Sequence, residues 1–355
     1  MRRKVYLLVS VLLIFVMLFT GCSNSSETKA PVEQKGNNKE AVSDGKVYEL
    51  KVSHVATTTD PIHQGWSFLK ETLESKSGGR IKVTIFPNKQ LSNSNNEDAE
   101  KVQQNIVQMT SVPTSSLAAI GDIKEYKVFD YPYLFETNEE LYKVIDSEIG
   151  DSLSKKLIEK TGIKAVGAYS LGWCGISTNK GPINSPEDIK GQKIRTLSSD
   201  LHIALIKAFG GSATPINYGE VFTALQQGTV DGMMTTTGLY VSDKFYEVQD
   251  YLGTVNAVSL LHVPVVNNEW YESLPDDLKA IYDESIDLYL DEVRKYEEEF
   301  DAKALQTLKD VGMEVQEYTP EQKQAFIDAT ANVINENENI AGKEIIDQVK
   351  TKLGK

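Results

Sequence analysis

The sequence predicts an α/β protein, because short alternating stretches take turns with segments of helical spacing along most of the chain. Tyr48, Leu50 and Val52 alternate with polar neighbours, as in a half-buried strand. Between positions 62 and 73, apolar residues recur every three or four positions, as on one helix face. A helical pattern from Pro275 to Leu308 is much longer than a usual globular helix of roughly 8–20 residues and could lie along two domains. The alternation predicts mainly parallel sheets, and 355 residues predict roughly two domains.

The other predicted elements follow one another at short intervals. Strands are predicted at 81–85, 109–112, 163–169, 193–195 and 230–232. Helices are predicted at 97–109, 138–145, 153–161, 201–208 and 220–227, with a final helix around Phe326. Thr137 and Thr319 have the sequence context of helix N-caps. Residues 113–116 are predicted to form a polar loop after a strand end.

Composition and motifs remove several classes of function. A net charge of −14 argues against nucleic acid or anionic lipid as the main partner. Two cysteines cannot form a disulfide scaffold or a thiolate metal cage, and the histidine spacings match no zinc motif, so no metal or cofactor is predicted. His202 follows Asp200 with serines nearby, but residues this close on a turn rarely form a catalytic triad. A secreted hydrolase or lyase is therefore disfavoured, and no enzyme activity is predicted.

The first 45 residues are predicted to contain a secretory signal peptide, a lipidated cysteine and a tether. A basic start and an apolar run of about 15 residues describe a secretory signal, too short for a bilayer-spanning helix of about 20. Thr20-Gly21-Cys22 resembles a bacterial lipobox, which makes residues 1–21 the signal peptide and Cys22 the lipidated first residue. Phe19 stands where the usual lipobox has Leu, and an ordinary signal peptide with a chance cysteine is the alternative. Residues 22–45 are polar and are predicted to form a flexible tether.

Several stretches together resemble the DctP family, the extracytoplasmic solute receptors of TRAP transporters. They occur in order over about residues 47–300, so the whole set is far more specific than any one member. They are GGRIKV at 78–83, FPNKQL at 86–91, YPYLF at 131–135, TN at 178–179, INSPEDIKGQKIR at 183–195, Pro215 with Glu220, ALQ at 224–226, VDG at 230–232 and KFYEV at 244–248.

The resemblance implies a periplasmic-binding-protein-like fold, in which two α/β domains joined by strands and one long helix close on a ligand. The corresponding boundaries are 46–172 with 261–300 for domain I, and 173–260 with 301–350 for domain II. Most known ligands of the family carry a carboxylate held by the arginine that corresponds to Arg195. A planar guanidinium can hold a carboxylate through two parallel hydrogen bonds. The alternative for Arg195 is a surface arginine in a structural ion pair.

Two departures from the family pattern make the expected pocket less cationic. Cys174 stands where relatives that bind sugar acids often have a second arginine, and Thr235 stands at the position of a ligand-touching asparagine. These changes favour a monocarboxylate with an aliphatic or aromatic body over a dicarboxylate. Cys174 is also the only thiol left after lipidation, and a buried free cysteine is usually an inert small hydrophobe.

Further pocket candidates lie near these stretches or after a predicted strand end. The alternative is core packing for the aromatic candidates and a satisfied structural role for His54. The aromatic candidates are Trp173, Tyr218 and, less favoured, Phe222. The polar candidates are His54, Thr114, Ser115 and Ser116.

The sequence thus predicts an extracytoplasmic, lipid-anchored receptor that captures a small organic acid by domain closure and delivers it to TRAP membrane subunits. A receptor of the same fold that signals to a sensor protein is the alternative. A binding protein of the ABC type shares the architecture, but the INSPEDIKGQKIR segment and the long helix favour the TRAP type.

Overall fold

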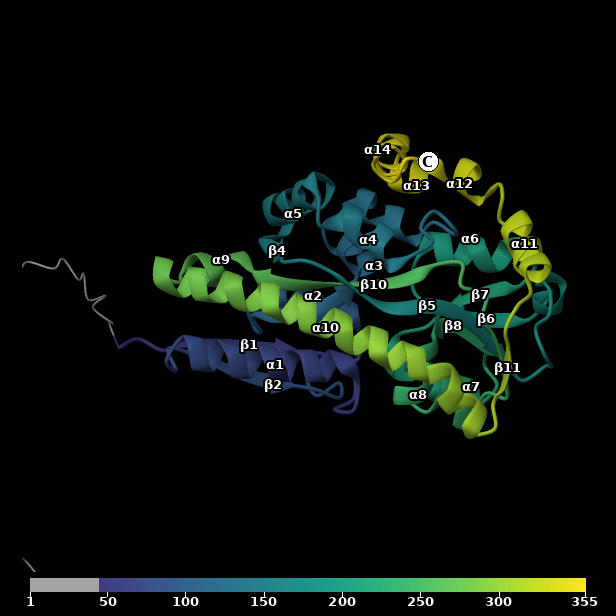
Figure 1. The fold of residues 1–355 in the computed structure, drawn as a ribbon, viewed down its shortest axis with the longest axis horizontal. Helices are drawn as coiled ribbons and strands as arrows, with labels where there is room; N and C mark the ends of the chain where they lie inside the picture. The colour runs from purple at the N-terminus through teal and green to yellow at the C-terminus, as the bar shows by residue number, and fades with distance from the viewer. Residues whose placement is uncertain (1–44) are drawn as a thin grey trace, which may run out of the picture. The chain divides into compact units, whose positions relative to one another are not determined.

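Within residues 45–355, the part of the chain that the computed structural model describes, eleven strands form one mixed sheet (Figure 1). The strand order is β2-β1-β3-β10-β5-β8-β6-β7, and β4, β9 and β11 pair off this path. These residues belong to one compact unit. The predicted signal peptide, Cys22 and nearly all of the predicted tether lie outside the described residues. The strands are β1 (Tyr48–Ser53), β2 (Ile81–Phe86), β3 (Met109–Pro113), β4 (Ile163–Ala165), β5 (Tyr169–Thr178), β6 (Lys193–Thr196), β7 (Ser212–Pro215), β8 (Gly232–Thr236), β9 (Tyr251–Gly253), β10 (Ser259–Asn267) and β11 (Glu314–Gln316).

The direction of strand pairing differs between the flanks and the centre of the sheet. β1 runs parallel to β2 and β3, and β6 runs parallel to β7 and β8, as the sequence predicts. β10 and β5 run antiparallel to each other and to β3 and β8, so the prediction of a mainly parallel sheet is wrong at the centre. All nine residues of β10 are buried, which removes the apolar–polar alternation that marks a half-buried strand.

Helices cover both faces of this sheet. The predicted N-caps are confirmed at Thr137 and Thr319, whose hydroxyls accept from the amides of Glu140 and Gln322. No helix of residues 45–355 has the length and apolar character needed to cross a membrane. The α-helices are α1 (Pro61–Lys76), α2 (Asn95–Gln103), α3 (Thr114–Ile120), α4 (Asn138–Ile145), α5 (Glu148–Thr161), α6 (Asp200–Ala208), α7 (Val221–Gln226), α8 (Thr237–Ser242), α9 (Asn268–Glu272), α10 (Asp276–Asp310), α11 (Pro320–Ala329), α12 (Val333–Glu336), α13 (Glu338–Ala341) and α14 (Lys343–Leu353), and the 3-10 helices are η1 (Lys124–Asp130), η2 (Pro186–Ile189), η3 (Tyr218–Glu220) and η4 (Phe245–Glu247).

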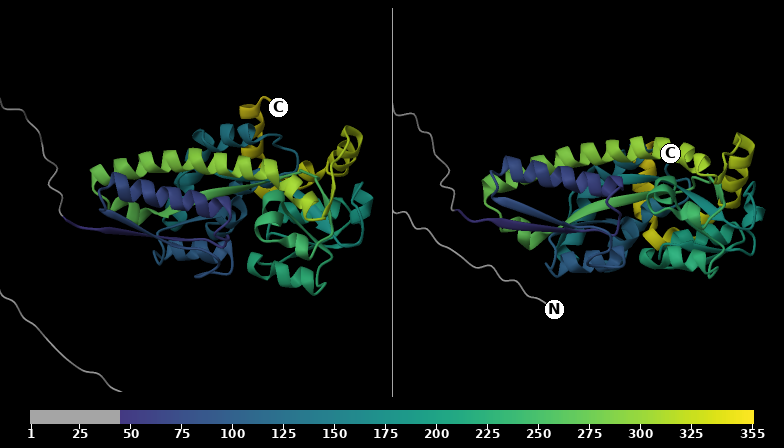
Figure 2. Two further views of the ribbon diagram at one scale, coloured as in Figure 1. Left: turned by 60° about the horizontal axis from the view of Figure 1, so that its bottom comes forward. Right: turned by 90° about the horizontal axis from the view of Figure 1, so that it is seen from below.

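The long helix predicted from Pro275 is confirmed as α10, which has 35 residues. It packs against α1 near its start and against β5 and α8 farther along. Figures 1 and 2 show it running from the end of the molecule that carries α1 and β1 to the end that carries α7 and β11. One continuous helix therefore lies along both flanks of the sheet.

Several local predictions are wrong. The strand predicted at 163–169 is interrupted, because β4 ends at Ala165 and β5 begins at Tyr169, and the strand predicted at 230–232 begins only at Gly232. α2 ends at Gln103 rather than at 109, because Asn105 has a φ of 54°, in the left-handed region that a right-handed helix excludes. The predicted loop at 113–116 is the start of α3, whose buried Leu117 and Ala118 give it an apolar face. The helix that holds Phe326 is not the last, because α12, α13 and α14 follow it.

The C-terminal helices pack against elements from the first half of the chain. α13 and α14 contact η1, and α14 also contacts α4. The hydroxyl of Tyr131 donates to the carbonyl oxygen of Asn337 at 2.6 Å. Ile345, Ile346 and Val349 are buried in the hydrophobic cluster that contains α4 and α5. α13 and α14 therefore lie against segments assigned from the sequence to domain I, although they were themselves assigned to domain II, whereas α12 contacts α6 of domain II.

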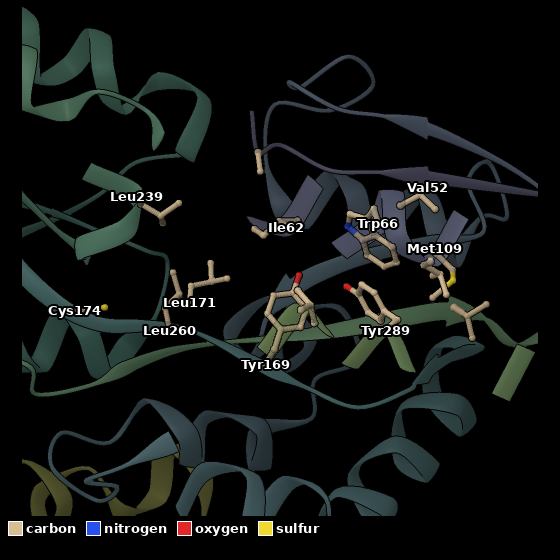
Figure 3. Packing of buried hydrophobic residues seen from close by; sticks show 14 of the residues in the cluster. Val52, Ile62, Trp66, Met109, Tyr169, Leu171, Cys174, Leu239, Leu260 and Tyr289 are labelled. Carbon is tan, nitrogen blue, oxygen red and sulfur yellow. The ribbon is translucent and has the colours of Figure 1, made fainter. Parts of the chain in front are cut away.

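Close packing of α1 on α10 forms the centre of the largest hydrophobic cluster. Trp66 and Tyr289 are fully buried, and their rings stack with centroids 4.8 Å apart (Figure 3). Gly65 allows this approach, because a Cβ atom at that position would lie 2.9 Å from Cγ2 of Val293. The two helices therefore depend on a large aromatic pair beside a residue without a side chain.

Replacing Trp66 with alanine should destabilise the protein by about 3–5 kcal/mol, the range for deleting a large buried aromatic side chain. Urea unfolding of the wild type and the W66A variant measures this loss. Trp66→Phe is the matched control, because it keeps a ring against Tyr289 and removes an indole N–H that has no hydrogen-bond partner among the described residues. Equal losses in both variants would show that the ring stack does not carry the packing.

Candidate functional site

Arg195 lies in the interior at the carboxyl end of β6. Only 1% of the residue is exposed. Because β7 and β8 flank β6 as parallel neighbours, Arg195 is at the strand edge where α/β proteins usually bind ligands. Its Nε and Nη2 donate to the carbonyl oxygen of Ile216, at 3.0 and 2.9 Å. These two bonds fix one edge of the guanidinium and leave the other edge for a further acceptor.

The charge of Arg195 has no acidic partner within residues 45–355. All of its side-chain hydrogen bonds end on the Ile216 oxygen. Burial lowers the pKa of Arg195 to about 10, so the group remains charged at neutral pH. An ionised side chain in the interior is costly unless an opposite charge or several hydrogen bonds compensate it.

Arg294 provides a contrast within the same chain. Its Nε and Nη2 also donate to one backbone oxygen, that of Ala168, at 2.9 and 2.7 Å. Unlike Arg195, it forms an ion pair with Asp146 at 2.9 Å. Arg294 lines a groove of about 840 Å³ between α5 and α10 whose walls carry charges of both signs. The guanidinium without an acidic partner is therefore that of Arg195, and not that of Arg294 in the larger groove.

Two cavities of about 30 Å³ each meet at Arg195. Both are lined by Arg195, Asn95, Pro113, Leu197 and Tyr218. The remaining walls of the first cavity are mostly polar: Ser94, Asn96, Ser115, Ser116, Ser198, Ile216 and Asn217. The remaining walls of the second are mostly apolar: Val55, Ala56, Ile62, Leu171, Thr235, Leu239, Leu260 and His262.

Four residues of the predicted site lie together in these walls. Arg195 and Tyr218 line both cavities, with the arginine Cζ 5.8 Å from the centre of the tyrosine ring. Thr235 lies on β8 in the apolar cavity, and Ser115 lies at the start of α3 in the polar one. Ser116, next along α3, also lines the polar cavity.

The other predicted site residues lie outside the two linings. Cys174 is buried on β5, and burial raises the pKa of its thiol, which keeps it protonated. Thr114 donates to Asp130 Oδ1 at 3.2 Å, and His54 Nε2 lies 3.2 Å from His63 Nδ1. Burial lowers the pKa of His54 to about 3, with the neighbouring His63 as a second cause.

Two further aromatic candidates also lie apart from the cavities. Trp173 packs against the cluster that contains α4 and α5. Phe222 lies against Phe245, with ring centroids 6.2 Å apart. Ligand contact by any of these residues stays a prediction that the two linings do not support.

Sequence reasoning missed several wall residues. The leucines Leu171, Leu239 and Leu260 look like ordinary core residues in the sequence. Asn95 lies in a polar run that gives no specific signal, and His262 lies inside the fully buried β10. Their shared signal is spatial, because distant segments of the chain bring them to Arg195.

A buried polar cluster supports the tyrosine of the site. The hydroxyl of Tyr218 donates to Asp243 Oδ2 at 2.6 Å. Asp60, the N-cap of α1, is 2% exposed and accepts from the amide of Ile62 at 2.9 Å. Burial raises the pKa of Asp60 to about 6, and the nearby charge of Asp243 also raises it. Burial likewise raises the pKa of Asp243.

Acidic side chains do not combine into a metal site here. Within residues 45–355, no three His, Cys, Asp or Glu side chains are grouped so that they could hold a metal ion. The chemistry that the cavities offer is one positive charge, several neutral hydrogen-bonding groups and an apolar wall.

Comparison with known proteins places this geometry in a family. The family model of the bacterial extracellular solute-binding proteins of family 7, DctP, matches residues 52–339. The C4-dicarboxylate-binding periplasmic protein DctP of Rhodobacter capsulatus is 31% identical over 302 residues, which is 85% of this chain and 90% of the relative.

Solved structures support the predicted fold class. The sugar acid binding protein DctPAm of Advenella mimigardefordensis, in complex with galactonate, is similar with a TM-score of 0.83 at 25% identity, over 87% of this chain and 98% of that one. A TRAP periplasmic solute binding protein of Shewanella oneidensis with bound succinate has a TM-score of 0.81 at 29% identity, over 86% and 99% of the two chains. The two-domain α/β fold of the TRAP receptors is thereby confirmed for this chain.

The raised pKa of Asp60 predicts a pH dependence of folding stability. A carboxyl group whose pKa is about 6 when folded and about 4 when unfolded binds its proton more tightly in the folded state. Its contribution to stability is therefore full at low pH and is lost as the pH rises from about 4 to 6, by on the order of 3 kcal/mol. Asp60→Asn keeps a good N-cap and should remove this part of the pH profile.

Chemical unfolding of both proteins at pH 4 to 7 measures the difference. Asp287→Asn, at an exposed position of α10, is the control for loss of one acid. Parallel profiles for the wild type and the D60N variant would contradict the role assigned to Asp60.

Proposed function

The chain belongs to the bacterial extracellular solute-binding proteins of family 7, the receptors of TRAP transporters, and we propose that it captures a small organic acid through Arg195. The family is one of transport receptors, so the expected task is binding and delivery. The acid then passes to the TRAP membrane subunits. No step of this task requires a change of covalent bonds.

The buried, uncompensated guanidinium of Arg195 carries this proposal. Nε and Nη2 face the Ile216 oxygen, so Nη1 and the second hydrogen of Nη2 form a free edge. A carboxylate matches that edge with two parallel, charge-assisted hydrogen bonds. It would also supply the negative charge that residues 45–355 do not provide at this position.

Capture by domain closure is the proposed mechanism. The cavity walls come from segments assigned to both proposed domains, such as Ile62 and Asn95 on one side and Arg195 and Thr235 on the other. A ligand that contacts both sides stabilises the closed form relative to the open one. The contacts of α13 and α14 favour assigning these two helices to domain I, whereas α12 contacts α6 of domain II.

Two polar contacts between the proposed domains support the same mechanism. Lys127 forms an ion pair with Asp200 at 2.6 Å, and Ser199 donates to Asp130 at 2.7 Å. Each contact joins η1 to the region where β6 leads into α6. Such contacts can help to hold a closed form without touching the ligand.

We also propose that Cys22 carries a lipid that anchors the receptor outside the cytoplasm. The support is the sequence pattern at residues 18–22, which resembles a lipobox. The first strand of the described residues, β1, begins at Tyr48, so a stretch of more than twenty mostly polar residues separates Cys22 from β1 in the sequence.

Arg195→Met should abolish carboxylate binding. Breaking one partner of a buried charge pair typically costs about 3–5 kcal/mol, which lowers the affinity at least about 100-fold. A thermal-shift screen of residues 46–355 against small carboxylates measures the effect, because a ligand that binds only the folded state raises Tm with its concentration. Arg294→Met is the matched control and should keep every shift. Shifts that persist in the R195M variant would overturn the assigned site.

Replacement of Cys22 with serine should abolish lipid attachment. Growth of an expressing bacterium with radiolabelled palmitate should label the wild type and leave the C22S variant unlabelled. Cys174→Ser, the change of the other cysteine, should keep the label. A labelled C22S variant would place the anchor elsewhere.

A further inference from the structure

We infer that the captured acid carries a single carboxylate on a short apolar body, with one neutral polar group that faces His262. This inference rests on the proposed function and specifies its ligand. It differs from what the names of the dicarboxylate-binding relatives would suggest for this chain.

The first argument is the charge of the cavity walls. Arg195 is the only Lys, Arg, Asp or Glu among the described residues that line either cavity. Lys89 lies outside both linings, with its Nζ 5.5 Å from the centre of the Tyr218 ring, and its charge acts on Asp243. One guanidinium balances one carboxylate, and the walls offer no second cation for a second carboxylate.

The second argument is the apolar wall. Beside Arg195, the second cavity is bounded by aliphatic side chains from α1, β5, α8, β10 and the loops that follow β1 and β6. Four of these side chains are labelled in Figure 3: Ile62, Leu171, Leu239 and Leu260. A second carboxylate placed among them would lose its water and gain no positively charged partner, which costs several kcal/mol. A methyl or methylene group at the same place would gain free energy by burial.

The third argument is the neutral polar group in the apolar cavity. His262 Nδ1 lies 3.1 Å from Ser111 Oγ, which lies 2.5 Å from the hydroxyl of Tyr169. Burial lowers the pKa of His262 to about 3, so its imidazole is neutral at physiological pH. The Ser111 contact occupies Nδ1, whereas Nε2 makes no hydrogen bond within residues 45–355. A hydroxyl, oxo or amide group of the ligand suits that nitrogen, because a neutral ring supplies a hydrogen bond but no charge.

The fourth argument is size. A water molecule needs about 10–15 Å³ of such a cavity, so each of the two holds about two or three small groups. Together they accommodate an acid of about four to six non-hydrogen atoms. Butyrate and its 2-hydroxy and 2-oxo derivatives are close to this size, whereas succinate adds a second charge.

Calorimetric titration of the wild type with butyrate, 2-hydroxybutyrate, 2-oxobutyrate, succinate and monomethyl succinate tests the inference. We expect at least one of the three butyrate-type acids to bind about 100-fold more tightly than succinate. Monomethyl succinate, which is larger than succinate but has one charge less, should bind more tightly than succinate does. This order separates charge from size.

The role of His262 has its own readout. His262→Leu removes the free ring nitrogen. In the wild type, the tighter-binding of 2-hydroxybutyrate and 2-oxobutyrate should bind more tightly than butyrate. In the H262L variant, that acid and butyrate should bind about equally. A ratio unchanged from that of the wild type overturns the assignment of His262. If the variant does not fold, the wild-type affinities still test the assignment. Butyrate that binds as tightly as both substituted acids overturns the role of His262.

The outcomes also separate this inference from the proposed function. Succinate that binds within tenfold of the best monocarboxylate, with all binding lost in the R195M variant, overturns the single-carboxylate inference and supports Arg195 as the anion site. No binding of any carboxylate overturns the proposed function, and this inference with it.

Discussion

The arrangement of the site depends on the free-energy cost of keeping one charged guanidinium out of water. Arg195 is 1% exposed, and its only hydrogen-bond partner within residues 45–355 is a backbone oxygen on the loop after β7. An ion in such a place is stabilised far less than one that pairs with a carboxylate. A ligand anion therefore contributes most when the walls have closed around it, since water no longer competes for the guanidinium. Binding and closure are coupled through the same charge, and no separate trigger is required.

That coupling needs a scaffold that is continuous and can bend. β5 and β10 pass through the centre of the sheet, and α10 lies along both flanks. The register between β10 and β5 shifts between Ser259 and Leu261, and irregularities of this kind bend strands locally. The boundary proposed from the sequence, between residues 260 and 261, falls at this shift. In the proposed closure, a bend at this shift would let Arg195 and Ile62 approach or separate while the strands that join the two sides stay paired.

The sequence could predict elements whose signals are local. The length of α10 follows from an uninterrupted helical pattern after Pro275, and the caps at Thr137 and Thr319 follow from short-range hydrogen bonding. β10 escaped notice because both of its faces are buried, so it shows no alternation. The end of α2 near Asn105 depends on backbone conformation, and the start of α3 depends on burial. Residue composition indicates neither of them well.

The same distinction applies to the site. Arg195, Tyr218 and Thr235 were predicted from their positions in family motifs, and Ser115 from its place after a strand end; all four line the two cavities. Thr114, one residue before Ser115, instead donates to Asp130, because successive residues of a helical turn face different directions. The aliphatic wall could not be identified from the sequence, since a leucine that lines a cavity and a leucine that fills a core look alike in it.

Because the chain is acidic, Arg195, the one buried Lys or Arg among residues 45–355, is especially important. With a net charge of −14, the average field outside the protein repels an anion, so long-range steering does not favour the proposed ligand. Salt screens that repulsion over about 8–10 Å, whereas the contact with a buried guanidinium is screened much less. Affinity for an acid must then come from the short-range pairing at Arg195 and from the apolar wall beside it. A second carboxylate would add to the repulsion outside the protein and would meet no second cation in the cavity walls. The surface and the cavity therefore favour the same kind of ligand, one with no more negative charge than Arg195 can neutralise.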